Sequence, residues 1–130
     1  MRRFAVLGSV LAGVAACAPA PNPAPAAPAR VVFFTPWSAD LDDAAQGVVA
    51  DAARVAQAAP GRPVLVEGYA DFTVGSTQAN QDLTRLRAQH VADGLVQRGV
   101  APGRIVLRPR AAGTGDPGVE SRRVVIELGS

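Results

Sequence analysis

Apolar and polar positions divide the chain from Val31 onward into four short strand-like runs. VVFF, Val31 to Phe34, is a continuous apolar and β-prone run, which is typical of a buried strand. VLVEGYA, Val64 to Ala70, predicts a second strand. A third strand is expected around Ile105 to Leu107 and should end at Pro109, and a fourth is expected over RRVVIEL, Arg122 to Leu128.

Two helical patterns lie between these strands. The first helix can be capped by Ser38 or Asp40 and is ended by the Pro-Gly pair at 60–61. Its apolar stripe recurs at intervals of three and four residues and consists of Leu41, Ala45, Val48, Ala52, Val55 and Ala59. The second helix should begin near Thr77 to Asn80 and end at Gly99.

The order of these elements is strand, helix, strand, helix, strand, loop, strand. This order predicts an α+β fold in which two helices pack on a mixed four-stranded sheet as a two-layer sandwich. The connection before the last strand, AAGTGDPGVES, has turn chemistry and no apolar stripe. Residues 31–130 are enough for one small domain that folds without metal or disulfide.

One charge conflicts with the apolar pattern of the second helix. Leu83, Val91 and Leu95 recur at helical spacing, and Arg87 lies between the first two. An unpaired buried guanidinium is very costly, so Arg87 should snorkel to solvent or find a partner. Asp71 directly follows the second strand, and a right-handed crossover brings these ends to the same edge of the sheet. Two explanations remain open, a structural ion pair and a shared zwitterionic ligand.

The N-terminal segment has the layout of a secretory signal. MRRFAVLGSVLAGVAACAPA contains two arginines, an apolar run and small residues before Cys17, and the run is too short to cross a bilayer. VAAC, Val14 to Cys17, resembles the lipobox of bacterial lipoproteins, in which the cysteine is lipidated and becomes the first residue. We expect a signal peptide at residues 1–16 and a lipid on Cys17. The alternative is ordinary cleavage after Ala20, which would leave a soluble protein without cysteine.

A linker at residues 17–30 joins this signal to the domain. Ala18 to Ala29 alternates proline with small residues, which predicts a polyproline-like spacer. Extended at about 3.1 Å per residue, this segment reaches about 37 Å. By resemblance to lipoprotein sorting, an alanine rather than an aspartate after Cys17 favours the outer membrane.

Charge and residue types exclude several classes of protein. The formal net charge is +2, and without Arg2 and Arg3 the 13 basic residues fall to 11, equal to the 11 acidic residues. No basic run with interleaved aromatics marks a nucleic-acid surface. His90, the only histidine, has neither a catalytic nor a metal-binding constellation around it. We therefore expect no nucleic-acid partner, no enzyme activity, no cofactor and no metal.

Several other residues have ordinary structural explanations. Acids at the start of the first helix complement the helix dipole, which favours capping over calcium binding; they are Asp40, Asp42 and Asp43. Arg122 and Arg123 should point to opposite faces of a strand, so that one pairs and the other meets solvent. Trp37 is expected to cover the sheet edge rather than to recognise a sugar.

The segment from Ala70 to Ala88 resembles the signature of the OmpA-like C-terminal domain, which is also found in peptidoglycan-associated lipoproteins. The family pattern runs T-D-x-x-G-S-x-x-Y-N-x-x-L-S-x-x-R-A, and Asp71 and Gly75 are here separated by one residue more than in that pattern. Phe33 to Leu41 and Ser121 to Leu128 resemble the family's first and closing strands. The signature positions are Ala70-Asp71, Gly75-Ser76, Ala79-Asn80, Leu83-Thr84 and Arg87-Ala88.

The resemblance implies a βαβαββ fold and a site for diaminopimelate, an amino acid of the Gram-negative peptidoglycan stem peptide. Carried over by position, Asp71 would accept hydrogen bonds from the ligand's ammonium group, and Arg87 would bind its carboxylate with a bidentate fork. Backbone N–H groups at the start of the second helix would add to the carboxylate site. The further residues implied are Gly75, Ser76, Thr77 and Asn80.

These features together predict a lipid-anchored outer-membrane protein whose periplasmic domain binds peptidoglycan and tethers the membrane to the wall. Envelope proteins of a Tol-type system are further expected partners. The alternative is a docking lipoprotein of an envelope complex, with the same fold and no peptidoglycan binding. A peptidoglycan-cleaving enzyme is disfavoured because the sequence shows no paired carboxylates or zinc ligands at suitable spacing. A flagellar-type stator is disfavoured because the sequence shows no true transmembrane helix.

Overall fold

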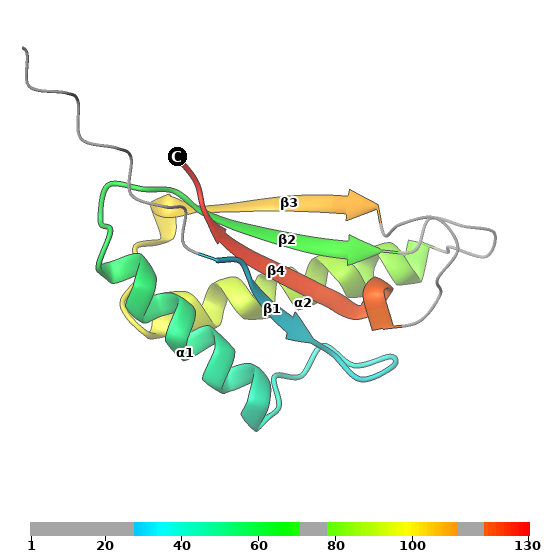
Figure 1. The fold of residues 1–130 in the computed structure, drawn as a ribbon. Coiled ribbons are helices and arrows are strands. Elements are labelled where there is room, and N and C mark those ends of the chain that lie inside the picture. Colours follow the sequence, from blue (N-terminus) through cyan, green and yellow to red (C-terminus); the bar gives the residue numbers. More distant parts are fainter. Residues whose placement is uncertain (1–27, 71–77, 112–118) are drawn as a thin grey trace, which may run out of the picture.

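Four strands form one mixed sheet in the order β1-β4-β2-β3 (Figure 1). The computed structural model describes residues 28–70, 78–111 and 119–130. β4 pairs antiparallel with β1 and β2, and β2 and β3 are parallel. The predicted α+β fold with a mixed sheet is confirmed. The strands are β1 (Arg30–Phe33), β2 (Val64–Ala70), β3 (Ile105–Ala111) and β4 (Arg123–Leu128).

Two helices connect the first three strands in the predicted order. α1 (Asp43–Gln57) joins β1 to β2, and α2 (Gln78–Gln97) joins β2 to β3. The short turns η1 (Pro102–Arg104) and η2 (Val119–Arg122) precede β3 and β4. In the part of the chain that the structure describes, no helix combines the length and the apolar character needed to span a bilayer.

One apolar core lies between the helices and one face of the sheet. Successive residues of a strand point to opposite faces, and the register places Val32 beside Val124 and Val66 beside Ile126 on the covered face. Both helices contribute to this core, and Leu95 of α2 is its largest fully buried side chain. The core fixes the height of α2 over the sheet and thereby the position of Arg87.

The first helix begins later than the sequence predicts. Asp42, rather than Ser38 or Asp40, is its N-cap, because Asp42 Oδ1 accepts a hydrogen bond of 2.8 Å from the N–H of Ala45. Ser38 Oγ instead accepts from the N–H of Asp40 and shapes the segment before the helix. The buried face keeps two members of the predicted stripe and consists of Ala45, Val49, Ala52, Ala53 and Ala56.

Two of the strand predictions are wrong in detail. The run VVFF is not continuously buried, since Phe33 is 53% exposed. β3 does not end at Pro109 but continues to Ala111. Because β3 is an edge strand, a residue without an N–H group can lie in it without removing a hydrogen bond from the interior of the sheet.

α2 begins inside the predicted window and places Arg87 within its buried face. It ends at Gln97, two residues before Gly99, whose φ of 97° is a left-handed conformation that favours glycine. Leu83 is only half-buried. The buried residues are Thr84, Arg87, Ala88, Val91, Ala92, Gly94 and Leu95.

Candidate functional site

Arg87 extends from α2 toward the segment between β1 and α1, and its side chain is held by backbone carbonyl groups. Its Nε donates a hydrogen bond of 2.7 Å to the carbonyl oxygen of Ser38, and its Nη2 donates one of 3.1 Å to that of Thr35. The guanidinium carbon lies 5.3 Å from the ring centre of Phe34. Arg87 is only 4% exposed. It therefore neither snorkels to solvent nor forms an ion pair with a described carboxylate.

The electrostatic surroundings of Arg87 are unusual for a cation. Burial lowers the pKa of Arg87, and the like charge of Arg122 lowers it further. An arginine nevertheless stays protonated near neutral pH, because its ordinary pKa is far above 7. Two positive charges are therefore held near each other, and a negatively charged ligand would stabilise both.

A hollow of about 280 Å³ opens beside these two arginines. It lies where the start of α2, the segment after β1 and the turn η2 meet. Its described lining contains two guanidinium groups and no carboxylate. The Nε of Arg122 is buried and has no hydrogen-bond partner among the described residues. The lining residues are Pro36, Trp37, Asn80, Leu83, Thr84, Arg87, Ser121 and Arg122.

The structure brings together two of the residues that the sequence marks as candidates. Arg87 and Asn80 both line the hollow. Thr84, one turn after Asn80, donates its hydroxyl hydrogen to the carbonyl oxygen of Asn80 at 2.9 Å and lines the hollow as well. The remaining candidates lie outside the described residues; they are Cys17, Asp71, Gly75, Ser76 and Thr77.

Sequence reasoning missed two residues of this hollow. Arg122 was expected to alternate with Arg123 on a strand, but it belongs to η2, and β4 begins only at Arg123. Arg123 instead lies over the ring of Tyr69, 4.0 Å from its centre. Trp37 does not cover the sheet edge, since it is 80% exposed. A signal for Arg122 was present in the closing motif SRRVVIEL, where the first arginine precedes the alternating strand pattern.

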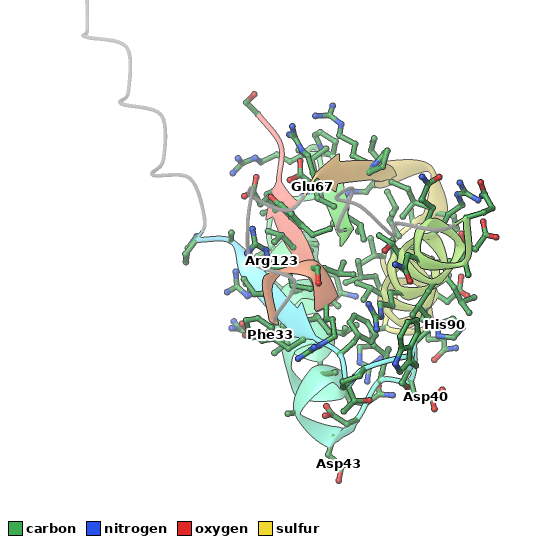
Figure 2. The ribbon with its side chains drawn as sticks, turned by 90° about the vertical axis from the view of Figure 1, so that its right-hand side faces the viewer. Phe33, Asp40, Asp43, Glu67, His90 and Arg123 are labelled. Atoms are coloured by element: carbon green, nitrogen blue, oxygen red, sulfur yellow. The ribbon has the colours of Figure 1, made fainter. Side chains whose placement is uncertain are left out.

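His90 lies apart from this hollow and has a structural contact. Its Nδ1 is 2.6 Å from the carbonyl oxygen of Ala39, so His90 joins α2 to the segment before α1. Figure 2 shows His90 beside Asp40, whereas Phe33 and Arg123 lie on the sheet side of the molecule. Within the described ranges, no group of three or more potential ligands is placed to hold a metal ion.

A second, more apolar groove runs between α2 and the edge strand β3. Its volume is about 480 Å³, and Leu107, 42% exposed, and Pro109 form its β3 side. Arg85 and Arg108 also line it. The other lining residues are Gly68, Gln81, Thr84 and Ala88.

The family of this chain follows from its sequence. The model of the OmpA family matches residues 33–123, which is more than half of the chain. The chain therefore belongs to the OmpA family. A search of curated proteins found no match.

Solved structures of OmpA-like domains share this fold. The peptidoglycan-associated lipoprotein from Burkholderia pseudomallei is 24% identical, with a TM-score of 0.64 over 76% of this chain and 89% of that one. The periplasmic domain of Helicobacter pylori MotB is 21% identical, with a TM-score of 0.61 over 75% of this chain and 67% of that one. The cell wall anchor of the T6SS from Pseudomonas aeruginosa is 27% identical, with a TM-score of 0.55 over 78% of this chain and 80% of that one.

Proposed function

We propose that this chain is a lipid-anchored envelope protein whose domain binds peptidoglycan without making or breaking covalent bonds. One observation carries the proposal: Arg87 and Arg122 line the same hollow, and its described lining contains no acid. Arg87 is buried, and the Nε of Arg122 is buried without a hydrogen-bond partner in the described part of the chain. Such a site favours a ligand with carboxylate groups, and peptidoglycan stem peptides carry several.

The chemistry of the two arginines suggests how a diaminopimelate side chain would bind. Arg87 uses Nε and one N–H of Nη2 for the backbone, which leaves its Nη1 group for a carboxylate. Arg122 would supply a second donor. Asp71 remains the proposed acceptor for the ligand's ammonium group. The backbone near Thr77 to Asn80 remains a proposed source of N–H donors. Charge-assisted hydrogen bonds contribute about 1.5–3 kcal/mol each, so a single site would bind weakly.

The relatives support a role at the cell wall. One solved relative is named a peptidoglycan-associated lipoprotein, and another, at 27% identity, is named a cell wall anchor. OmpA-like domains are binding and structural modules rather than enzymes. Because peptidoglycan repeats its stem peptide and a membrane anchor confines the domain, many weak contacts would act together through effective concentration.

The proposed anchor consists of the N-terminal residues. A signal peptide at 1–16 would be removed, Cys17 would carry lipid, and the linker at 17–30 would hold the domain at 31–130 away from the outer membrane. In a Gram-negative host, the wild-type chain should fractionate with the outer membrane. Cys17→Ser should move it to the soluble periplasmic fraction or leave the signal uncleaved. Unchanged fractionation with a cleaved signal would argue against the lipid anchor.

The binding proposal is tested by sedimenting the full chain with purified diaminopimelate-type peptidoglycan. The wild type should co-sediment, and Arg122→Gln and Asp71→Ala should each reduce the bound fraction strongly. Arg85→Gln is the matched control, because Arg85 lies on the exposed side of α2 with 71% of its side chain accessible. Equal co-sedimentation of wild type and Arg122→Gln would remove the central support for the proposal.

The apolar groove between α2 and β3 favours a second candidate, the docking lipoprotein of an envelope complex. Its exposed Leu107 is the kind of side chain that a protein partner would bury. The two candidates are separated by a chain in which both Asp71 and Arg122 are replaced, because Arg87 also holds the turn after β1. If this chain still supports envelope integrity in cells while it no longer binds the wall, docking is the main function.

A further inference from the structure

Trp37 lies at the hollow with most of its side chain in solvent. It is 80% exposed, more than any other large apolar side chain among the described residues. It lines the hollow together with Arg87 and Arg122. An indole in water leaves a large apolar area uncovered, and tryptophan is enriched at interfaces, where one part of the ring system is covered and its N–H stays accessible.

The backbone at Trp37 is also unfavourable for a bulky residue. The N–H of Ser38 donates a hydrogen bond of 3.2 Å to the carbonyl oxygen of Thr35, which closes a four-residue turn. Pro36 occupies the second position of this turn, and Trp37 the third, with φ of 60°. Turns with a left-handed third residue favour glycine or asparagine there. Trp37 therefore has an unfavourable backbone conformation as well as an exposed apolar side chain. Unfavourable backbone conformations of this kind concentrate at functional sites.

The turn that carries Trp37 is fixed to the arginine of the hollow. The two carbonyl oxygens that accept hydrogen bonds from Arg87 belong to Thr35 and Ser38, the first and last residues of this turn. Two hydrogen bonds from Arg87 thus hold the backbone that carries the indole beside the guanidinium group. The turn therefore places an exposed aromatic side chain next to the proposed carboxylate-binding group before any ligand arrives, which lowers the entropic cost of binding.

We propose that Trp37 stacks on a sugar ring of the glycan strand that carries the stem peptide. The inference rests on the proposed function and names a second part of the ligand. One face of a pyranose ring presents C–H groups with small positive partial charges, which pack on the negative face of an aromatic ring. A stem peptide of three residues spans about 10 Å between its diaminopimelate and the sugar. The sugar is therefore within reach of a side chain beside the hollow.

Two ligands separate the sugar contact from the peptide contact. One is a soluble disaccharide muropeptide with a diaminopimelate stem peptide, and the other is the same stem peptide freed from its sugars by an amidase. Both are titrated by calorimetry into the full chain in mild detergent. Trp37→Ala should weaken muropeptide binding about five- to tenfold, as expected for loss of one aromatic contact, and leave stem-peptide binding within about twofold. Trp37→Gly, which suits the turn, should give the same result with unreduced thermal stability.

The single tryptophan provides an independent readout. All indole fluorescence of the chain comes from Trp37. Muropeptide should shift the emission to shorter wavelength and protect it from acrylamide quenching, whereas the free stem peptide should do neither.

Each other outcome has a distinct meaning. If Trp37→Ala weakens the binding of both ligands equally, or leaves the binding of both unchanged, the sugar contact is wrong although the peptide site stands. If the wild type binds muropeptide and ignores the stem peptide, and Trp37→Ala removes that binding, the sugar contact stands and the diaminopimelate site is wrong. If the wild type binds neither ligand, both inferences are overturned.

Discussion

The Nε of Arg87 donates a hydrogen bond of 2.7 Å to the carbonyl oxygen of Ser38. This bond and the one to Thr35 connect the middle of α2 to the turn that follows β1. Arg87 therefore has a structural role as well as its proposed role in binding. A variant that removes Arg87 alters both, which makes Arg122 the better residue for isolating the ligand contact.

Arg87→Ala is expected to lower the free energy of unfolding by about 1–3 kcal/mol, because the domain loses a buried side chain and its two hydrogen bonds to the turn after β1. Urea unfolding of the full chain measures this change. Arg85→Ala, on the exposed side of the same helix, should stay within about 0.5 kcal/mol of the wild type. If the two variants are equally stable, the carbonyl contacts of Arg87 contribute nothing to the fold.

Arg122→Gln is expected to leave the free energy of unfolding unchanged or to raise it by up to about 1 kcal/mol. Its buried Nε has no hydrogen-bond partner within the described ranges to lose, and its positive charge acts unfavourably on Arg87. Any gain should be larger at low ionic strength, where like charges are screened less. Urea unfolding at two salt concentrations tests this, and a clear loss of stability at both would show that Arg122 holds the fold.

Asp42→Ala is expected to destabilise the domain by about 1 kcal/mol, because the first turn of α1 loses its N-cap. Asp40→Ala is the matched control, since Asp40 lies two residues before the cap and the structure gives its carboxylate no capping contact. Thermal or urea denaturation distinguishes the two variants. Equal losses would mean that the general negative charge near the helix start matters and the specific hydrogen bond to Ala45 does not.

Asp51 should make the domain sensitive to acid. Hydrogen bonds from Arg30 at 2.6 Å and Arg54 at 2.5 Å lower the pKa of Asp51 below its ordinary value of 3.8. A lowered folded-state pKa contributes stability above the unfolded-state pKa, and this contribution is lost as pH falls through the folded-state pKa. The stability difference between wild type and Asp51→Asn should be constant above pH of about 5 and shrink in stronger acid. A difference that grows as pH falls would contradict this assignment.

The architecture was predictable because each element leaves a local pattern in the sequence. The strand around Val64 to Ala70 and the stripe of α2 could be recognised without knowing what they contact. Strand order was not encoded in such patterns, and without it the edge position of β3 and the place of Pro109 within that strand could not be foreseen. The cap at Asp42 was missed because three acids stand close together and only geometry selects one of them.

The candidate site was predictable only in part. The sequence showed that Arg87 needed a partner, and it suggested a carboxylate or a ligand. The structure supplies backbone carbonyl groups of Thr35 and Ser38, which no side-chain pattern can indicate. The sequence does not indicate Arg122 because the alternating strand pattern begins only at Arg123. It does not indicate Trp37 because a large apolar side chain is normally covered, and Trp37 is exposed.

The position of β4 in the sheet has a consequence for how the protein is made. β4 is the last strand along the chain, yet it lies between β1 and β2. A chain that emerges from a ribosome or a secretion channel with its N-terminus first therefore carries β1 without a neighbouring strand until the final residues arrive. Unpaired apolar strand edges promote aggregation. The sheet can therefore be completed only after β4 has been synthesised.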